Sequence, residues 1–344
     1  MIPAAPGQAV ARLLPFAVLI GLGAAWGLAT PMTKIMVAAG YRDLGIVFWQ
    51  SVIDLVILLP VLARCGGLPR HPAAWRLYLF VAFFGSVLPG AASATAARFV
   101  PSGVVSLCLS LVPLFALPLA LMLGTDRASP ARLLGLASGL LGVALILWPG
   151  SLGAPTGGTG PGLALCLALI APLSYAVEGN GVARLTQGAT GADVLAPGLL
   201  GAAQMVAGAA LVSALISGPL ALSRGVFLWP FDLPQGAGLA ALAPLALLGS
   251  ALISLAAYVG YLWLIGKAGA VFAAQVSYLV TGFGVYWAMV LLGERFAPGF
   301  WAAMAVIFGG LILVQPRNAA PPTPPKTTLP LVAEPGPDNM GPTH

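Results

Sequence analysis

The chain has 344 residues, of which 59% are hydrophobic and only 7% are charged. Soluble domains carry about a quarter charged residues, so this composition excludes an ordinary soluble protein and indicates a membrane protein. The formal charge of +6 does not indicate a nucleic-acid partner, because the Lys and Arg residues fall at the ends of apolar runs, where membrane orientation accounts for them.

Apolar runs that are long enough to cross a bilayer as helices recur along the chain. About 20 helical residues cross a hydrocarbon core of roughly 30 Å, and no run shows the alternation of a membrane β-barrel. The first run continues past the length of a signal peptide, so we expect it to be retained. The runs predict ten transmembrane helices, at about 13–36, 44–63, 75–97, 101–123, 131–149, 161–184, 194–217, 237–263, 269–292 and 298–316.

The chain contains an internal repeat. Residues 104–149 and 273–316 both have an apolar run, a short turn with Gly, an acidic residue and Arg, a Pro, and a second apolar run, so that Pro130 corresponds to Pro298. The sequence therefore predicts an all-α polytopic protein of two five-helix repeats. We expect the first repeat at 1–149, a Gly- and Thr-rich linker at 150–160, the second repeat at 161–316, and a disordered cytoplasmic tail at 317–344.

The odd number of helices in each repeat determines the topology. A second five-helix unit must enter the membrane from the opposite side, which makes the halves inverted repeats of the kind that build many secondary transporters. Most Lys and Arg residues outside the helices fall on the side of the N-terminus, among them Arg12, Arg64, Arg70, Arg76 and Arg184. This bias predicts that both termini are cytoplasmic.

Four predicted helices carry polar residues at spacings of three and four, so each set shares one helix face. They are Ser86 and Ser93 in the third helix, Ser102, Ser106 and Ser110 in the fourth, Ser250, Ser254, Tyr258 and Tyr261 in the eighth, and Gln275 and Tyr278 in the ninth. The third and fourth helices are equivalent to the eighth and ninth, which predicts a shared midplane cavity. The alternative is that Ser and Gly only permit close helix packing. Trp26 is expected to wall the cavity, unless it is a packing residue.

Three charged residues lie within the predicted helices. Asp54 is near the centre of the second helix, where insertion scales give a cost of about 2.5–3.5 kcal/mol for a lone carboxylate, so it needs a partner, a proton or water. We expect Asp54 to be the proton-linked residue and Glu178 to be a substrate or gating contact. The alternatives are a structural ion pair or hydrogen bond for Asp54, a cytoplasmic-edge charge for Glu178, and a snorkelling side chain for Lys34. Whether Asp54 pairs with Lys34 is left open.

Catalytic and metal-binding motifs are not apparent. His71 and His344 fall outside the predicted helices, and the Gly-rich linker lacks the Lys and Ser or Thr of a phosphate loop. The three cysteines are odd in number, and Cys108 and Cys166 lie in apolar runs, so a disulfide framework is not expected. We therefore expect no cofactor, no metal and no enzymatic activity.

Several motifs together resemble the EamA family of the drug/metabolite transporter superfamily. They are Trp26-Gly27 with Lys34 downstream, the Leu-Pro-Gly of residues 88–90, the run VPSGVVSLCLSLVPLF, and the turn Gly293-Glu294-Arg295. The likeness covers about residues 13–316 and implies an exporter of amino acids, other metabolites or drugs. The chain departs from it at Gln50, where many relatives carry Arg, so no anion-binding Arg is carried over.

The expected function is export of a small metabolite across a bacterial cytoplasmic (inner) membrane by alternating access, with proton coupling as one option. The alternative is a polytopic membrane enzyme or structural subunit that acts on lipid-linked substrates. An enzyme of that kind would be expected to gather carboxylates, His or Arg at one membrane face. The expected partners are a small-molecule substrate and the lipid bilayer, with room for a homodimer.

Overall fold

The computed structural model describes residues 6–64, 66–124, 128–147, 161–186, 195–196, 198–225, 229, 238–268, 270–273 and 275–314. Across these ranges the chain is helical and contains no strand. Seven helical spans are long and apolar enough to cross a membrane, and shorter apolar helices at Pro130–Ile146, Val276–Leu292 and Pro298–Val314 supply the other three of the expected ten. The predicted linker at 150–160 and the tail at 317–344 lie outside the described residues.

Several spans consist of consecutive helical pieces. The first half contains α1 (Pro6–Gly27), α2 (Ala29–Ala38), α3 (Asp43–Arg64), α4 (Pro72–Val81), the π-helix η1 (Ala82–Val87), α5 (Leu88–Ala96), α6 (Ser102–Leu109), α7 (Val112–Met122) and α8 (Pro130–Leu147). The second half contains α9 (Pro161–Thr186), α10 (Leu199–Ser223), the 3₁₀ helix η2 (Gly238–Leu242), α11 (Ala243–Ala268), α12 (Ala270–Ala273), α13 (Val276–Leu292) and α14 (Pro298–Val314).

The repeat seen in the sequence has the same local structure in both copies. Gly124 and Gly293 follow α7 and α13 with φ of 68° and 66°, the left-handed region in which glycine commonly ends a helix. Pro130 and Pro298 then occupy the first positions of α8 and α14, where the missing N–H of proline has no intrahelical partner to lose. Equivalent residues therefore form equivalent turns.

The seventh span ends later than predicted. The sequence predicts that the seventh span ends near residue 217, before Gly218 and Pro219, yet α10 continues to Ser223 with Pro219 inside it. Proline is tolerated in a membrane helix where neighbouring groups satisfy the backbone that it frees.

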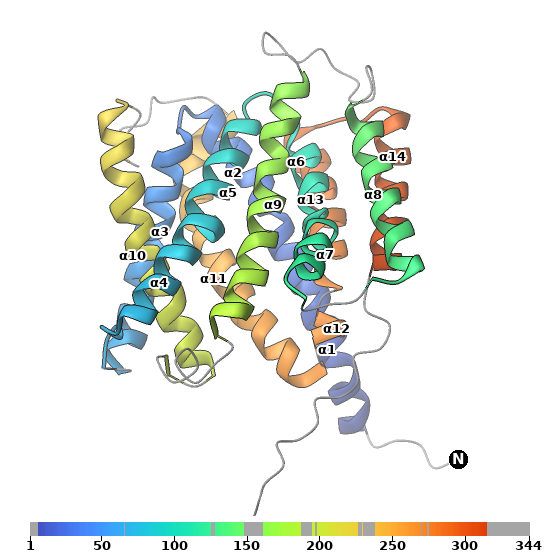
Figure 1. Ribbon diagram of the computed structural model, residues 1–344. Coiled ribbons are helices and arrows are strands. Elements are labelled where there is room, and N and C mark those ends of the chain that lie inside the picture. The colour runs from blue at the N-terminus through green and yellow to red at the C-terminus, as the bar shows by residue number, and fades with distance from the viewer. Residues whose placement is uncertain are drawn as a thin grey trace, which may run out of the picture.

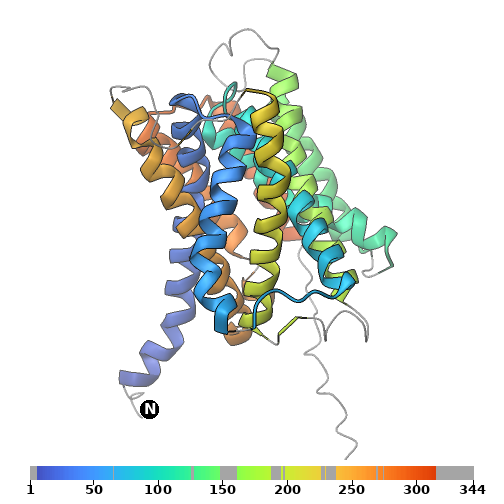
Figure 2. The ribbon, with the colours of Figure 1, turned by 90° about the vertical axis from the view of Figure 1, so that its left-hand side faces the viewer.

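The main contacts between the halves are symmetric: when each helix is replaced by its counterpart in the other half, the same contacts result. The second span packs on the seventh (α3 on α10) and the fifth on the tenth (α8 on α14). The contact of α1 with α13 is matched by that of α9 with α7, and the contact of α2 with α11 by that of α5 with α9. Figure 1 shows α8 and α14 together on one side of the bundle, and Figure 2 shows α3 beside α10 on the other.

The two halves run through the bundle in opposite directions. In Figure 1, α1 begins at the lower end of the bundle, whereas α9 begins at the upper end. Successive spans alternate in direction, and α14 ends at the lower end, where α1 begins. The fold is thus an all-helical, polytopic bundle of two inverted halves, as expected from the odd number of helices in each repeat.

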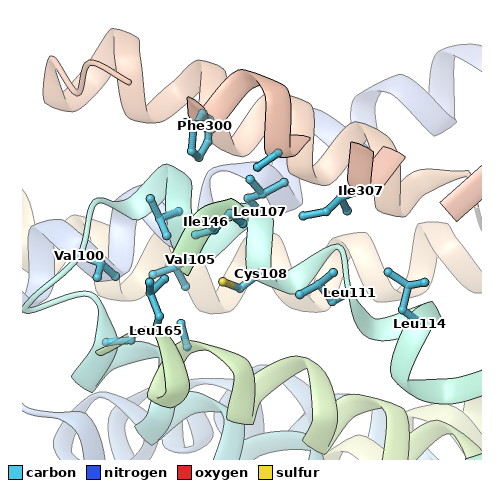
Figure 3. Close-up of a cluster of buried hydrophobic side chains, with 14 of the residues drawn as sticks. Val100, Val105, Leu107, Cys108, Leu111, Leu114, Ile146, Leu165, Phe300 and Ile307 are labelled. Atoms are coloured by element: carbon cyan, nitrogen blue, oxygen red, sulfur yellow. The ribbon is translucent and has the colours of Figure 1, made fainter. Parts of the chain in front are cut away.

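The largest buried apolar cluster joins α6, α7, α8, α9 and α14. Its residues include Leu107, Cys108, Leu111, Ile146, Leu165, Phe300 and Ile307, which lie together in Figure 3. The pairing of α8 with α14 depends on glycine, because a Cβ added to Gly310 would lie 3.0 Å from the backbone nitrogen of Gly139. Cys108 is a free thiol inside this cluster, and Cys166 is free and exposed.

Candidate functional site

The polar face of α11 connects three neighbouring helices inside the bundle. The Gln50 amide on α3 donates a hydrogen bond to the Ser250 hydroxyl at 2.8 Å, and Ser250 in turn donates to the Leu247 carbonyl. Further along α11, Tyr258 lies within electrostatic range of Glu178 on α9. Tyr261 lies beside Trp26 of α1, with 5.9 Å between ring centroids. The predicted polar stripe of α11 therefore faces α3, α9 and α1.

Glu178 packs against the backbone of η1. A Cβ added to Gly85 would lie 2.6 Å from Cδ and 2.8 Å from Oε2 of Glu178, so the carboxylate occupies space that only glycine leaves open. Tyr175, one turn earlier on α9, is close enough to interact with the same charge. Among the described residues, none donates a hydrogen bond to Glu178 or forms an ion pair with it.

The π-helix η1 gives this site its shape. A π-helix displaces backbone hydrogen bonds from the i−4 pattern, and such segments are frequent at functional sites. The Ser174 hydroxyl donates to the Phe84 carbonyl at 2.8 Å, and the Ser213 hydroxyl donates to the Ala82 carbonyl at 3.4 Å. Pro89 is the second residue after η1, and a proline cannot donate to the carbonyl four residues earlier, here that of Gly85. Two carbonyls of η1 thus accept hydrogen bonds from side chains of α9 and α10.

Asp54 lies on α3 one turn beyond Gln50, at the level at which α11 presents Ser254, because α3 and α11 run in the same direction and are in contact. Its Oδ1 atom is buried and accepts no hydrogen bond from the described residues. It does not pair with Lys34, because the Lys34 ammonium donates to the carbonyls of Ala97 and Val100, the latter at 3.0 Å. The pairing that the sequence left open is therefore not present.

Lys34 and Glu294 both act at the upper end of the bundle. Lys34 binds carbonyls at the end of α5, whereas the Glu294 carboxylate accepts hydrogen bonds from the backbone N–H groups of Ser102 (2.6 Å) and Gly103 (3.0 Å), which begin α6. A cation at a helix C-terminus and an anion at a helix N-terminus both complement the helix dipole. The two side chains thus stabilise the turn between α5 and α6.

Next to this turn, three helices approach closely. The hydroxyls of Thr30 on α2 and Ser106 on α6 are hydrogen-bonded. A Cβ added to Gly27 would lie 2.9 Å from the Gly284 nitrogen, and one added to Gly284 would lie 2.8 Å from the Ser106 Cβ. The Trp287 indole N–H also donates to the Ala24 carbonyl at 2.9 Å, which joins α13 to α1.

The other predicted cavity residues lie at helix breaks or in packed clusters. Ser110 is buried between α6 and α7, and its hydroxyl donates to the Leu107 carbonyl at 2.7 Å. Gln275 precedes α13 at the break after α12, and Tyr278 lies edge-on to Phe308 at 5.8 Å. Ser93 is half-buried on α5. The structure thus brings Trp26, Glu178 and Tyr258 to faces joined by α11, and a cavity lined by the full set stays a prediction.

Sequence reasoning did not identify Gly85 or the capping role of Glu294 as important. Gly85 carried a signal, because it lies four residues before Pro89 in an otherwise apolar helix. The role of Glu294 depends on α6, which is almost two hundred positions earlier in the chain, so no local pattern predicts it.

The fold and its polar interior define a multi-pass, all-helical membrane protein built from inverted halves. The model of the EamA-like transporter family matches residues 14–148, which confirms the resemblance to that family, within the drug/metabolite transporter superfamily, over the first repeat. A solved structure titled "Crystal structure of protein" aligns with 88% of this chain and 96% of that chain, at a TM-score of 0.54 and 18% identity, a likeness that shows the fold alone. No curated protein matches the chain.

Proposed function

We propose that the protein is a secondary transporter of the drug/metabolite type that exports small metabolites, such as amino acids or drugs, across the bacterial cytoplasmic membrane by alternating access. The observation that carries the proposal is the symmetric set of helix contacts between two inverted halves. The match of residues 14–148 to the EamA-like transporter family supports it. In such folds the two access states arise when one half rocks against the other about a midplane site.

The distribution of contacts is compatible with loading of cargo from the lower end. The upper end is held by the Gly27–Gly284 approach, the Thr30–Ser106 hydrogen bond and the Glu294 cap. Glu178 and Tyr258 lie in the lower halves of α9 and α11. With both termini in the cytoplasm, the lower end is cytoplasmic, and an exporter loads its cargo from that side.

Uptake into inside-out vesicles tests the function. Vesicles that contain the wild-type protein, incubated with a panel of labelled amino acids and drugs, should show saturable uptake of at least one compound, and preloading with unlabelled compound should produce counterflow. Empty-vector vesicles provide the background. Flux that does not saturate, no counterflow, or no flux for any compound would overturn the proposal.

Asp54 is the proposed proton-linked residue. A carboxylate that is shielded from water and has a buried oxygen without a hydrogen-bond donor can gain a proton in one access state and lose it in the other. Asp54→Asn should therefore abolish accumulation driven by a pH gradient while substrate exchange persists, because exchange needs no net proton movement. The check is uptake and exchange measured in the same vesicles. An Asn variant that still concentrates substrate would leave Asp54 with a structural role only.

A further inference from the structure

The carboxylate of Glu178 is not neutralised by any side chain that the structure describes. Lys34, the lysine within the first span, does not pair with it, since its ammonium group is held at the upper end by the carbonyls of Ala97 and Val100. A carboxylate among membrane helices requires a proton, water or a cation. The site therefore has the charge that suits a cationic ligand and opposes an anionic one.

Two tyrosines lie within electrostatic range of Glu178. Tyr175 comes from the same helix, and Tyr258 approaches from α11, a helix that is not packed side by side with α9 over their described residues. Tyr261, one turn after Tyr258, continues the aromatic face to Trp26. Aromatic faces attract organic ammonium groups within about 6 Å of the ring, and more strongly where water is excluded.

The backbone of η1 completes the site on one side. Gly85 has no side chain, and a Cβ there would displace the Glu178 carboxylate. Ser174 holds the next carbonyl of η1, that of Phe84, so the backbone facing the carboxylate is fixed by the same helix that carries Glu178. Gly85 therefore positions Glu178 without contributing charge.

We propose that Glu178, Tyr175 and Tyr258 bind the ammonium group of an amphipathic organic amine, with Gly85 as a positioning residue. This inference rests on the proposed transport function, for which it names the class of cargo as cationic amines. The carboxylate pairs with the ammonium group, and the two tyrosines supply aromatic groups near it. Neutral and anionic molecules of the same shape lack the charge that this pairing needs.

Calorimetric titration of the purified, detergent-solubilised protein tests the site. The probes are phenethylamine, 2-phenylethanol and 3-phenylpropionate, which share an aromatic body but carry a positive, zero and negative charge. Phenethylamine should bind at least about tenfold more tightly than the other two, a difference of about 1.4 kcal/mol. Equal binding of the three probes, or no binding of the amine, would overturn the proposal.

Variants locate the binding within the protein. Glu178→Gln should weaken phenethylamine binding at least about tenfold and remove the preference for positive charge, and Gly85→Ala should weaken it in the same direction. Asp43→Asn removes a carboxylate at the start of α3, far along the chain from this site, and should leave amine binding unchanged. Thermal unfolding of each variant shows whether it is folded. Glu178→Asp keeps the carboxylate and should keep the preference for the positively charged probe, and loss of that preference in a folded Asp variant would contradict a role of charge.

Each result has a separate meaning for function and site. Unchanged amine affinity in Glu178→Gln overturns the site even where vesicles transport a compound. Amine binding that depends on Glu178 supports the site even where vesicles show no flux, and that flux result alone would then overturn the transport function.

Discussion

At the residue scale, glycine determines how closely the helices of the upper end approach. The sequence shows abundant glycine but does not distinguish a glycine in a close helix contact from one that faces open space. On α13, Gly284 faces Gly27 and Ser106, whereas an added Cβ on Gly282 would meet no atom within 4 Å. Two glycines only two positions apart on one helix therefore have different roles, because their faces differ.

This difference gives a matched pair of substitutions. Gly284→Ala should lower the free energy of unfolding by about 1–3 kcal/mol, because overpacking a tight contact forces neighbouring backbone to shift. Gly282→Ala should be neutral or stabilising by about 0.5–1 kcal/mol, because alanine loses less backbone entropy in a helix. Thermal or denaturant unfolding in detergent measures both, and equal effects of the two substitutions would contradict the close contact.

The intramembrane charges show the limit of sequence reasoning at this scale. The sequence identified Lys34, Asp54 and Glu178 as unusual, because charges are costly in a bilayer. It did not predict the groups near Lys34 and Glu178, which come from the end of α5, from η1 and from α11. Nor did it predict that the buried Oδ1 of Asp54 has no hydrogen-bond donor among the described residues. The contacts of a charged side chain depend on helices far away in sequence, and no periodicity encodes them.

At the scale of the element, apolar length predicted all ten spans, but it did not predict how they are broken. The spans divide at Leu28, at Ser110–Leu111 and at Gln275, and η1 interrupts the third. Each break is short and leaves the hydrophobic pattern intact, so the pattern predicts one continuous helix across it. Prolines shortly after three of these breaks, Pro31, Pro89 and Pro113, gave a physical reason to expect irregular backbone there.

The turn between α13 and α14 has a testable role in joining the halves. Its Glu294 satisfies two backbone N–H groups at the start of α6, which otherwise have no intrahelical partner. Glu294→Ala should therefore lower stability by about 1–2 kcal/mol, as expected for loss of a helix cap.

The conservative change separates hydrogen bonding from charge. Glu294→Gln keeps one acceptor oxygen and should cost less than Glu294→Ala, because it loses chiefly the interaction with the helix dipole, about 0.3–1 kcal/mol. Unfolding midpoints of the two variants in one detergent give the comparison. Midpoints equal to that of the wild-type protein in both variants would show that the cap has no energetic role.

At the scale of the whole molecule, the inverted arrangement followed from the sequence because two signals coincide. An apolar pattern gave five helices on each side of residues 150–160, and the repeated turn fixed which helices correspond. The structure adds the contacts between counterpart helices, in which α3 packs on α10 and α8 packs on α14. The sequence could name equivalent helices, but their partners depend on packing across the bundle.

Inverted halves place equivalent turns on opposite faces of the membrane. In a chain whose native cysteines Cys65, Cys108 and Cys166 are replaced by alanine, single cysteines at Gly124 and Gly293 should react with a membrane-impermeant maleimide from opposite sides. The turn after α7 lies at the lower end of the bundle and the turn after α13 at the upper end. With the N-terminus cytoplasmic, intact cells should label only the cysteine at 293, and inside-out vesicles only the one at 124. Both positions are glycines with left-handed φ, which a cysteine adopts at a cost, so a second pair at Ser129 and Ala297 guards against misfolding of the first. Labelling of both turns from one side would rule out the inverted topology, and with it alternating access by exchange of the two halves.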